Sequence, residues 1–183
     1  MARVRLTSRA PWEQERRIVG MVASPVENLS IVLLKLDRPV QLSDFVRSVC
    51  VLDRDLVESY TGCVGLGWDS KEAELRLTSL STVPSSQCGS QSELTSSSVC
   101  VEEQDGSGEQ CGGEMMAGHG LLCPSSQGSG QWFLAGVSAW RRGCGSLGQR
   151  PRIYEVVSGT AEWVESVISR DRENSAVPRR RLG

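Results

Sequence analysis

The stretch of the chain with the clearest chemical pattern runs from Cys111 to Cys123 and reads C-G-G-E-M-M-A-G-H-G-L-L-C. Its two cysteines bracket a turn rich in glycine, which permits the positive φ angles that point backbone N–H groups outward. Turns of this kind form oxyanion holes beside a nucleophilic side chain. No Ser or Thr lies inside the bracket, and no further Cys, and its apex reads Met115-Met116-Ala117. The turn therefore has the glycine content of a hydrolase active-site turn but lacks a nucleophilic side chain.

The segment that follows the turn relates it to a known family. It reads W-F-L-A-G-V-S-A-W over residues 132–140 and G-C-G over 143–145. Turn and segment together resemble the C-terminal half of trypsin-like serine proteases, which read C-x-G-D-S-G-G-P-L-V-C and then W-x-L-x-G-V-x-S-W-G-x-G-C-G. Counting back from Cys123 puts the nucleophilic serine at Ala117, and counting forward from Cys111 puts it at Met115, because this loop is two residues longer. Neither side chain can be activated as a nucleophile.

A second match covers residues 28–52, N-L-S-I-V-L-L-K-L-D-R-P-V-Q-L-S-D-F-V-R-S-V-C-V-L. It resembles N-D-I-A-L-L-K-L-x-R-P-V-x-L-S-D-x-V-R-P-V-C-L-P of the same family. The catalytic aspartate of the family precedes I-A-L-L-K-L, and Ser30 stands in that place, where it cannot supply the negative charge that stabilises an imidazolium. The histidine segment A-A-H-C lies upstream of the matching region, and the chain's one histidine, His119, stands at a glycine of the family pattern. The resemblance implies no catalytic residue, with Ala117 and Ser30 as degenerate triad positions.

The resemblance also locates a specificity pocket. The residue two before Cys111 lies at the pocket floor in the family, and here it is Glu109, where trypsin-like enzymes keep an aspartate. Arg141 and Arg152 replace two glycines that leave room for a substrate side chain. We expect the two guanidinium groups to fill the pocket or to pair with Glu109. The alternative is that both point into solvent.

The number and spacing of the cysteines indicate an oxidising, extracellular compartment. Seven of them at irregular spacing, without C-x-x-C pairs, are typical of an extracellular disulfide framework rather than of a zinc site. In the scheme implied by the resemblance, six cysteines form three pairs, Cys63–Cys123, Cys88–Cys100 and Cys111–Cys144. Cys50 is left unpaired or interchain, and its family counterpart usually tethers the domain to an upstream segment.

The composition excludes several classes of function. A formal net charge of −2 argues against nucleic acid or an anionic membrane as the main partner. No apolar run approaches the length of a membrane-spanning helix. With one histidine and no C-x-x-C spacing, the sequence predicts no metal site, and we expect no cofactor.

The fold class follows from composition and resemblance together. Nineteen glycines, few aromatic residues and short apolar runs indicate an all-β protein with many turns. The resemblance covers residues 13–168 and implies a trypsin-like double Greek-key β-barrel that begins near the fifth strand of the six-stranded first barrel. We therefore expect an incomplete first barrel, a complete second barrel and one C-terminal helix. The predicted divisions are an irregular lead (1–14), a first-barrel part with linker (15–60), the second barrel with its helix (61–168) and a disordered basic tail (169–183).

Single elements can be placed within these divisions. The pattern predicts a buried strand over residues 18–23 that ends at Pro25, and a half-buried strand over residues 75–82. Residues 158–169 carry the clearest helix signal, with Ser158 or Thr160 as the cap and an apolar stripe that includes Trp163.

The sequence predicts a catalytically inactive serine protease homologue, a protein-binding or structural module of a secreted multi-domain protein, such as the last, inactive domain of a polyserase-type protein. Its partner is expected to be a protein or upstream domains of the same parent chain. Two alternatives stay open: a fragment of a serine-type endopeptidase whose active domains lie elsewhere in the parent, and a truncated product without function. The first 17 residues lack the apolar core of a signal peptide, so extracellular localisation rests on the resemblance. Asn28 begins an N-x-S glycosylation sequon.

Overall fold

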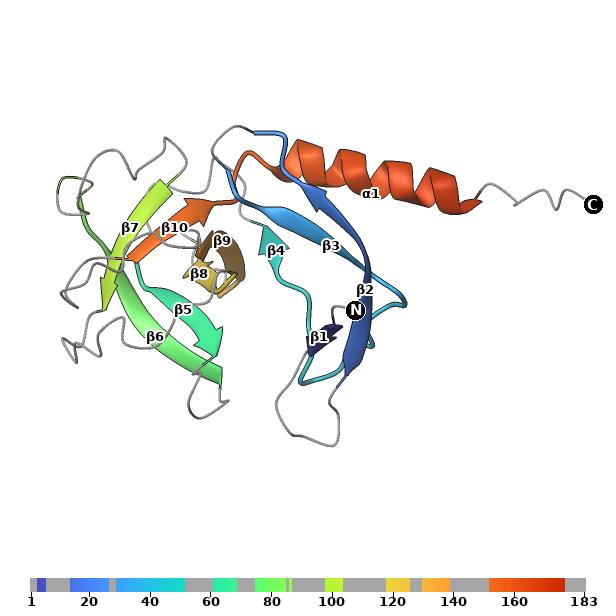
Figure 1. Ribbon diagram of the computed structural model, residues 1–183. Helices are drawn as coiled ribbons and strands as arrows, with labels where there is room; N and C mark the ends of the chain where they lie inside the picture. The colour runs from blue at the N-terminus through green and yellow to red at the C-terminus, as the bar shows by residue number, and fades with distance from the viewer. Residues whose placement is uncertain are drawn as a thin grey trace, which may run out of the picture.

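The computed structural model describes residues 3–5, 14–26, 29–51, 61–68, 75–84, 86, 98–103, 118–125, 130–138 and 152–176. These residues form strands, with a single helix near the C-terminal end, so the described chain is mostly β (Figure 1). The elements in chain order are β1 (Arg3–Arg5), β2 (Glu15–Ala23), β3 (Val32–Leu36), β4 (Cys50–Val51), β5 (Cys63–Trp68), β6 (Leu75–Thr82), β7 (Ser98–Glu103), β8 (Gly120–Pro124), β9 (Trp132–Ser138), β10 (Arg152–Val156) and α1 (Ala161–Ala176).

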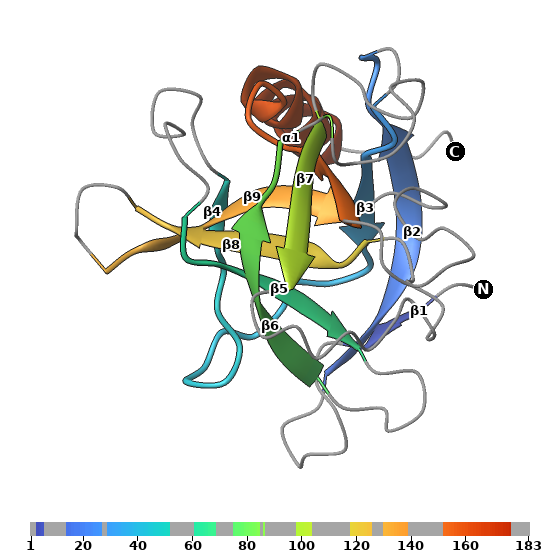
Figure 2. The ribbon, with the colours of Figure 1, turned by 90° about the vertical axis from the view of Figure 1, so that its left-hand side faces the viewer.

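Six of these strands close into a barrel, which faces the viewer in Figure 2. Neighbouring strands pair in the order β10-β7-β6-β5-β8-β9, and β10 also pairs with β9, so the ring is complete. All six pairings are antiparallel. Closure leaves none of the six strands with an unpaired edge. The predicted complete second barrel with one C-terminal helix is confirmed, as is the strand over residues 75–82.

The barrel core is built from side chains that alternate along these strands. In β9, Phe133, Ala135 and Gly136 are buried. In β8, Leu121 and Cys123 are buried, with a partly exposed residue between them. The side chains of the core that have almost no exposed surface are those of Cys63, Leu80, Val101, Leu121, Ala135 and Tyr154. Alternation with a period of two places every second side chain of a strand inside the barrel.

Gly136 allows β9 and β10 to approach closely enough to close the ring. A Cβ atom at this position would lie 3.0 Å from the carbonyl oxygen of Glu155 and 3.2 Å from Cβ of Tyr154. A backbone oxygen cannot swing aside as a flexible side chain can. Gly120 on β8 offers a contrast, since a Cβ there would meet only the Cδ1 end of Leu134, at 3.3 Å.

We predict that Gly136→Ala lowers the free energy of unfolding by about 1–3 kcal/mol, the usual range for overpacking a well-packed core. Gly120→Ala, on the neighbouring strand, should cost clearly less because the side chain of Leu134 can move. Urea unfolding of the oxidised chain measures both. Equal losses for the two variants would contradict the role given to the β9–β10 approach.

A second, smaller sheet contains the N-terminal strands in the order β1-β2-β3. The prediction that residues 1–14 are irregular is wrong in part, because Arg3–Arg5 forms β1 and pairs antiparallel with residues 15–17 of β2. The prediction of a buried strand over residues 18–23 is also wrong. The strand is present, but Val19 is 54% exposed and Met21 is 70% exposed, because no described element packs over that face.

Helix α1 begins and ends later than predicted. It covers Ala161–Ala176 instead of residues 158–169, so the expected disordered tail from residue 169 is helical up to residue 176, and residues 177–183 lie outside the described part. Thr160 directly precedes the helix, and its hydroxyl donates to the carbonyl of Val157 at 2.7 Å. The extension follows from charged helix-forming residues after Ser169 and from an ion pair at 2.5 Å between Lys35 Nζ on β3 and Asp171 Oδ1. Trp163 is half-buried, as the predicted apolar stripe requires.

Candidate functional site

Ser30, which the resemblance aligns with the triad aspartate, lies at the end of the turn between β2 and β3. The turn is held by backbone bonds from Ser24 N to Ile31 O at 2.8 Å and from Leu29 N to Val26 O at 3.2 Å. The side chain of Leu29 is buried, whereas Ser30 is exposed. The backbone N–H of Ser30 donates to Oε2 of Glu155 at 2.6 Å.

Glu155 is the residue that sequence reasoning missed. It lies on β10 with 1% of its surface exposed, so a carboxyl group of the second barrel reaches the place where the family pattern puts its catalytic carboxylate. It comes from a different strand, and it binds a backbone N–H. A bond of this kind ties the β2–β3 turn to the barrel instead of orienting an imidazole. The available signal was an acid inside the apolar run I-Y-E-V-V over residues 153–157.

We predict that Glu155→Ala accelerates hydrogen exchange of the Ser30 amide at least ~10-fold, because a charge-assisted bond to a buried acceptor is lost. The amide of Asp37, which donates to Arg17 O at the other end of the β2–β3 pairing, serves as the internal control. Amide exchange followed by NMR resolves the two. An unchanged Ser30 rate, or equal acceleration at both amides, would show that the carboxylate does not hold the turn.

His119 is the only histidine of the chain and directly precedes β8. Its backbone N–H donates to Oγ of Ser138 at 2.9 Å, and its carbonyl accepts from Ser138 N at 2.8 Å. Gly118, with a positive φ of 96°, adds a bond from its N–H to Ser138 O at 2.9 Å. The end of the glycine-rich loop is thus fixed to β9. Ser138 is itself 3% exposed, so this hydroxyl is not presented to a substrate.

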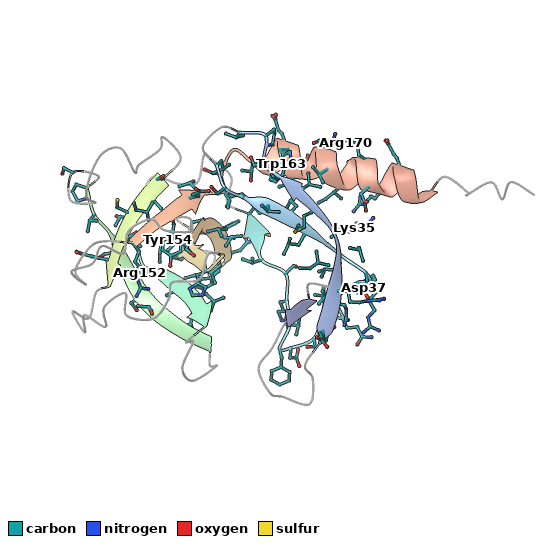
Figure 3. The ribbon with its side chains drawn as sticks, in the orientation of Figure 1. Lys35, Asp37, Arg152, Tyr154, Trp163 and Arg170 are labelled. Atoms are coloured by element: carbon teal, nitrogen blue, oxygen red, sulfur yellow. A yellow bond between two sulfur atoms is a disulfide. The ribbon has the colours of Figure 1, made fainter. Side chains whose placement is uncertain are left out.

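The environment of His119 disfavours its protonated form. Burial of the half-buried ring lowers its pKa below the ordinary 6.5, and repulsion by the nearby Arg152 guanidinium lowers it further. The imidazole is therefore neutral at pH 7. Arg152 lies on β10, half-buried, next to Tyr154 (Figure 3). Glu109 and Arg141 lie outside the described residues, so the filled pocket predicted for Glu109, Arg141 and Arg152 stays a prediction.

We predict that the free energy of unfolding falls as the pH drops below about 6.5, because the unfolded chain then takes up a proton on His119 that the folded chain binds more weakly. Above pH 6.5 this contribution is fully present. Denaturant unfolding from pH 8 to pH 5 measures the slope, and His119→Gln is the control that removes the titrating group. Identical slopes for wild type and variant would contradict the lowered pKa.

The disulfides are described in part. Cys63 on β5 and Cys123 on β8 form a disulfide, as the resemblance implied, with their Cα atoms 4.2 Å apart. Cys100 is also disulfide-bonded, to a partner beyond the described ranges. The described ranges also leave out Cys88, Cys111, Cys144, Ala117 and Asn28. The disulfide pairs of these cysteines and the roles assigned to Ala117 and Asn28 therefore stay predictions. Cys50 is exposed and free, and its sulfur accepts a hydrogen bond from Gln131 at 3.7 Å.

A polar cavity of about 460 Å³ lies at the start of β2, lined by Glu15, Arg16, Arg17, Asp37 and Arg38. Arg17 Nε pairs with Asp37 at 3.0 Å, and this pair holds the pKa of the Asp37 carboxyl below its ordinary value. The buried Arg16 donates to the carbonyl oxygens of Pro39 and Glu15 and to the side chain of Gln14. These bonds give the cluster a structural role, and none of its members was predicted as a site residue.

The described part of the chain contains no group of three or more metal-ligating side chains. It contains no helix long and apolar enough to cross a membrane.

The fold agrees with a comparison against protein families. The Trypsin family model matches residues 4–164. The match covers most of the chain, which therefore belongs to the trypsin family.

Proposed function

We propose that this chain is a catalytically inactive homologue of trypsin-like serine proteases that works by binding protein. The observation that carries the proposal is the contact between Ser30 and Glu155. The position of the triad aspartate holds an exposed serine whose N–H is taken by a buried carboxylate of β10, at 2.6 Å. This arrangement supports a structural role for the region.

The other triad positions support the same proposal. Ala117 or Met115 stands at the position of the nucleophile, and neither side chain can attack a carbonyl. The only histidine, His119, is fixed beside β9 by its backbone and is neutral next to Arg152. Hydrolysis by this family's mechanism needs nucleophile, base and carboxylate as a unit, so the loss of all three is not compensated by a glycine-rich loop.

A binding role draws its support from the surface. Several large apolar side chains of the β1-β2-β3 sheet are exposed, among them Met21 at 70%. Exposed apolar patches on soluble domains commonly mark interaction sites. We place the module in the extracellular space, within a secreted multi-domain protein and with Asn28 as a glycosylation site, because the family and the disulfides fit that setting.

We predict that the oxidised chain neither reacts with a fluorophosphonate probe nor hydrolyses arginine esters above the rate in buffer. Ala117→Ser should not restore either activity, since no base is placed to take the proton of the new hydroxyl. Gel fluorescence and ester hydrolysis measure this, with active trypsin as the positive control. Labelling that maps to residues 111–123 would overturn the proposal.

A further inference from the structure

The polar cavity at the start of β2 includes a side chain on the face of the β1-β2-β3 sheet that carries the helix. On β3, Lys35 points to the opposite face from Leu36, because side chains alternate along a strand. Ile18 lies opposite Leu36 and shares its face, so Arg17, the residue before it, points to the face of Lys35. Lys35 contacts Asp171 of α1, which identifies this face as the one that carries the helix (Figure 3). The cavity is therefore separate from the exposed apolar face of the sheet.

One wall of the cavity is a buried guanidinium group that is bonded to neutral oxygens. Arg16 is 7% exposed, and it donates to the carbonyl oxygens of Pro39 and Glu15 and to Oε1 of Gln14 at 3.1, 2.9 and 2.6 Å. No carboxylate among the described residues forms an ion pair with it. Its three bonds use three of the five N–H groups of an arginine. A buried cation without a counter-ion is costly, and an anion in the cavity compensates that charge.

The exposed rim of the cavity carries two cations around one anion. Arg17 Nε pairs with Asp37 at 3.0 Å, and Arg38 is exposed on the other side of Asp37 in the chain. The hydrogen bond from Arg17 is the largest cause that lowers the pKa of the Asp37 carboxyl, and the charge of Arg38 lowers it further. The carboxylate is therefore ionised at neutral pH, but it balances only one of the two guanidinium groups.

Strand β1 adds further positive charge beside the cavity. Its register places Arg3 opposite Arg17 and Arg5 opposite Glu15. Counted with the residues that line the cavity, this end of the sheet holds five arginines and two acidic residues. The local surplus of three positive charges contrasts with the formal net charge of −2 of the whole chain. Like charges directly opposite each other destabilise a strand pair, and a bound anion reduces that repulsion.

The lining of the cavity favours a sulfated sugar over an acidic peptide. Every described residue that lines it is charged, so the cavity offers no apolar side chain against which a peptide could pack. Its backbone is not open to an added strand either. Residues 15–17 pair with β1 on one edge of β2, and on the other edge Asp37 bonds to the backbone N–H and carbonyl of Arg17. Guanidinium groups bind oxyanions through paired, charge-assisted hydrogen bonds, which need no apolar contact.

We propose that this cavity of about 460 Å³ binds a sulfated polysaccharide, with Arg16 and Arg38 as contacts and with Arg17 held in place by Asp37. The bonds of Arg16 fix its guanidinium group before the ligand arrives, which reduces the entropy lost on binding. Polymers of this kind occur outside cells. The inference therefore uses the extracellular setting proposed above and adds a second kind of partner to the protein-binding role.

The first test measures the affinity of a size-defined heparin oligosaccharide for the oxidised 183-residue chain, by isothermal titration calorimetry at about 0.15 M salt. Arg38→Gln should lower the affinity at least ~5-fold, because an exposed cation of the cavity is lost. Asp37→Asn should raise it at least ~3-fold, because a negative charge is removed. Arg47→Gln is the matched control, since Arg47 is an exposed arginine outside the cavity, and it should change nothing. Absence of wild-type binding, equal losses for the two arginine variants, or a loss for Asp37→Asn would overturn the proposal.

The second test uses the wild-type chain and does not depend on how a variant folds. Modification of arginines by phenylglyoxal, mapped by mass spectrometry, should slow at least ~5-fold at Arg38 when the oligosaccharide is saturating. The rate at Arg47, whose side chain is 75% exposed, should not change. Equal protection of both arginines would mean non-specific charge neutralisation and would exclude the site.

A third measurement separates the two classes of ligand. A glutamate peptide of the same charge should bind at least ~10-fold more weakly than the oligosaccharide, because it meets no apolar contact and no free strand edge. Equal affinities would assign the cavity to acidic peptides and would overturn the assignment to a sulfated polysaccharide. Reaction with fluorophosphonate would overturn the inactive assignment and leave the affinity for the sugar unchanged, so the two proposals can fail independently.

Discussion

The described structure depends most on the double pairing of β10. This strand hydrogen-bonds to β7 on one side and to β9 on the other, and the second pairing turns an open sheet into a barrel. Buried side chains follow from closure: Ile153, Tyr154 and Glu155 are each nearly inaccessible on a five-residue strand. Closure requires a residue without a side chain at position 136, because the missing Cβ of Gly136 leaves room for the backbone of residue 155.

The same strand joins the two parts of the chain. Glu155 is held inside the barrel by the pairings on both sides of β10, so its carboxylate reaches Ser30 from a rigid base. A parallel pairing of β4 with β9 makes a second connection, with Cys50 opposite Phe133. Helix α1 adds a third through Lys35 and Asp171, although exposed ion pairs contribute little to stability. Among these contacts, the bond from Ser30 to Glu155 is the one whose acceptor side chain is almost completely buried.

Much of this could be predicted from residue patterns, and the failures have physical causes. The strand over residues 75–82 was predictable from its alternation, which is a local signal, whereas the complete second barrel came from the resemblance. The Cys63–Cys123 pair came from the resemblance, since spacing does not fix connectivity. The exposure of Met21 was not predictable, because an apolar strand looks the same whether or not another element covers it. Glu155 was missed because its role is defined by a partner 125 residues away.

The contact between Glu155 and Ser30 also bears on what the proposed loss of catalysis would mean for the trypsin fold. A catalytic carboxylate must remain available to stabilise an imidazolium, which limits the bonds it can make to the backbone. Once the aspartate position is a serine, that limit disappears, and a carboxylate from β10 can satisfy a backbone N–H of the β2–β3 turn instead. Burying a charge costs free energy, so the group is useful only where it accepts bonds from otherwise unsatisfied donors. In this chain the donor is Ser30, which the resemblance aligns with the catalytic acid, so under the proposed function this position contributes to the attachment of the hairpin to the barrel.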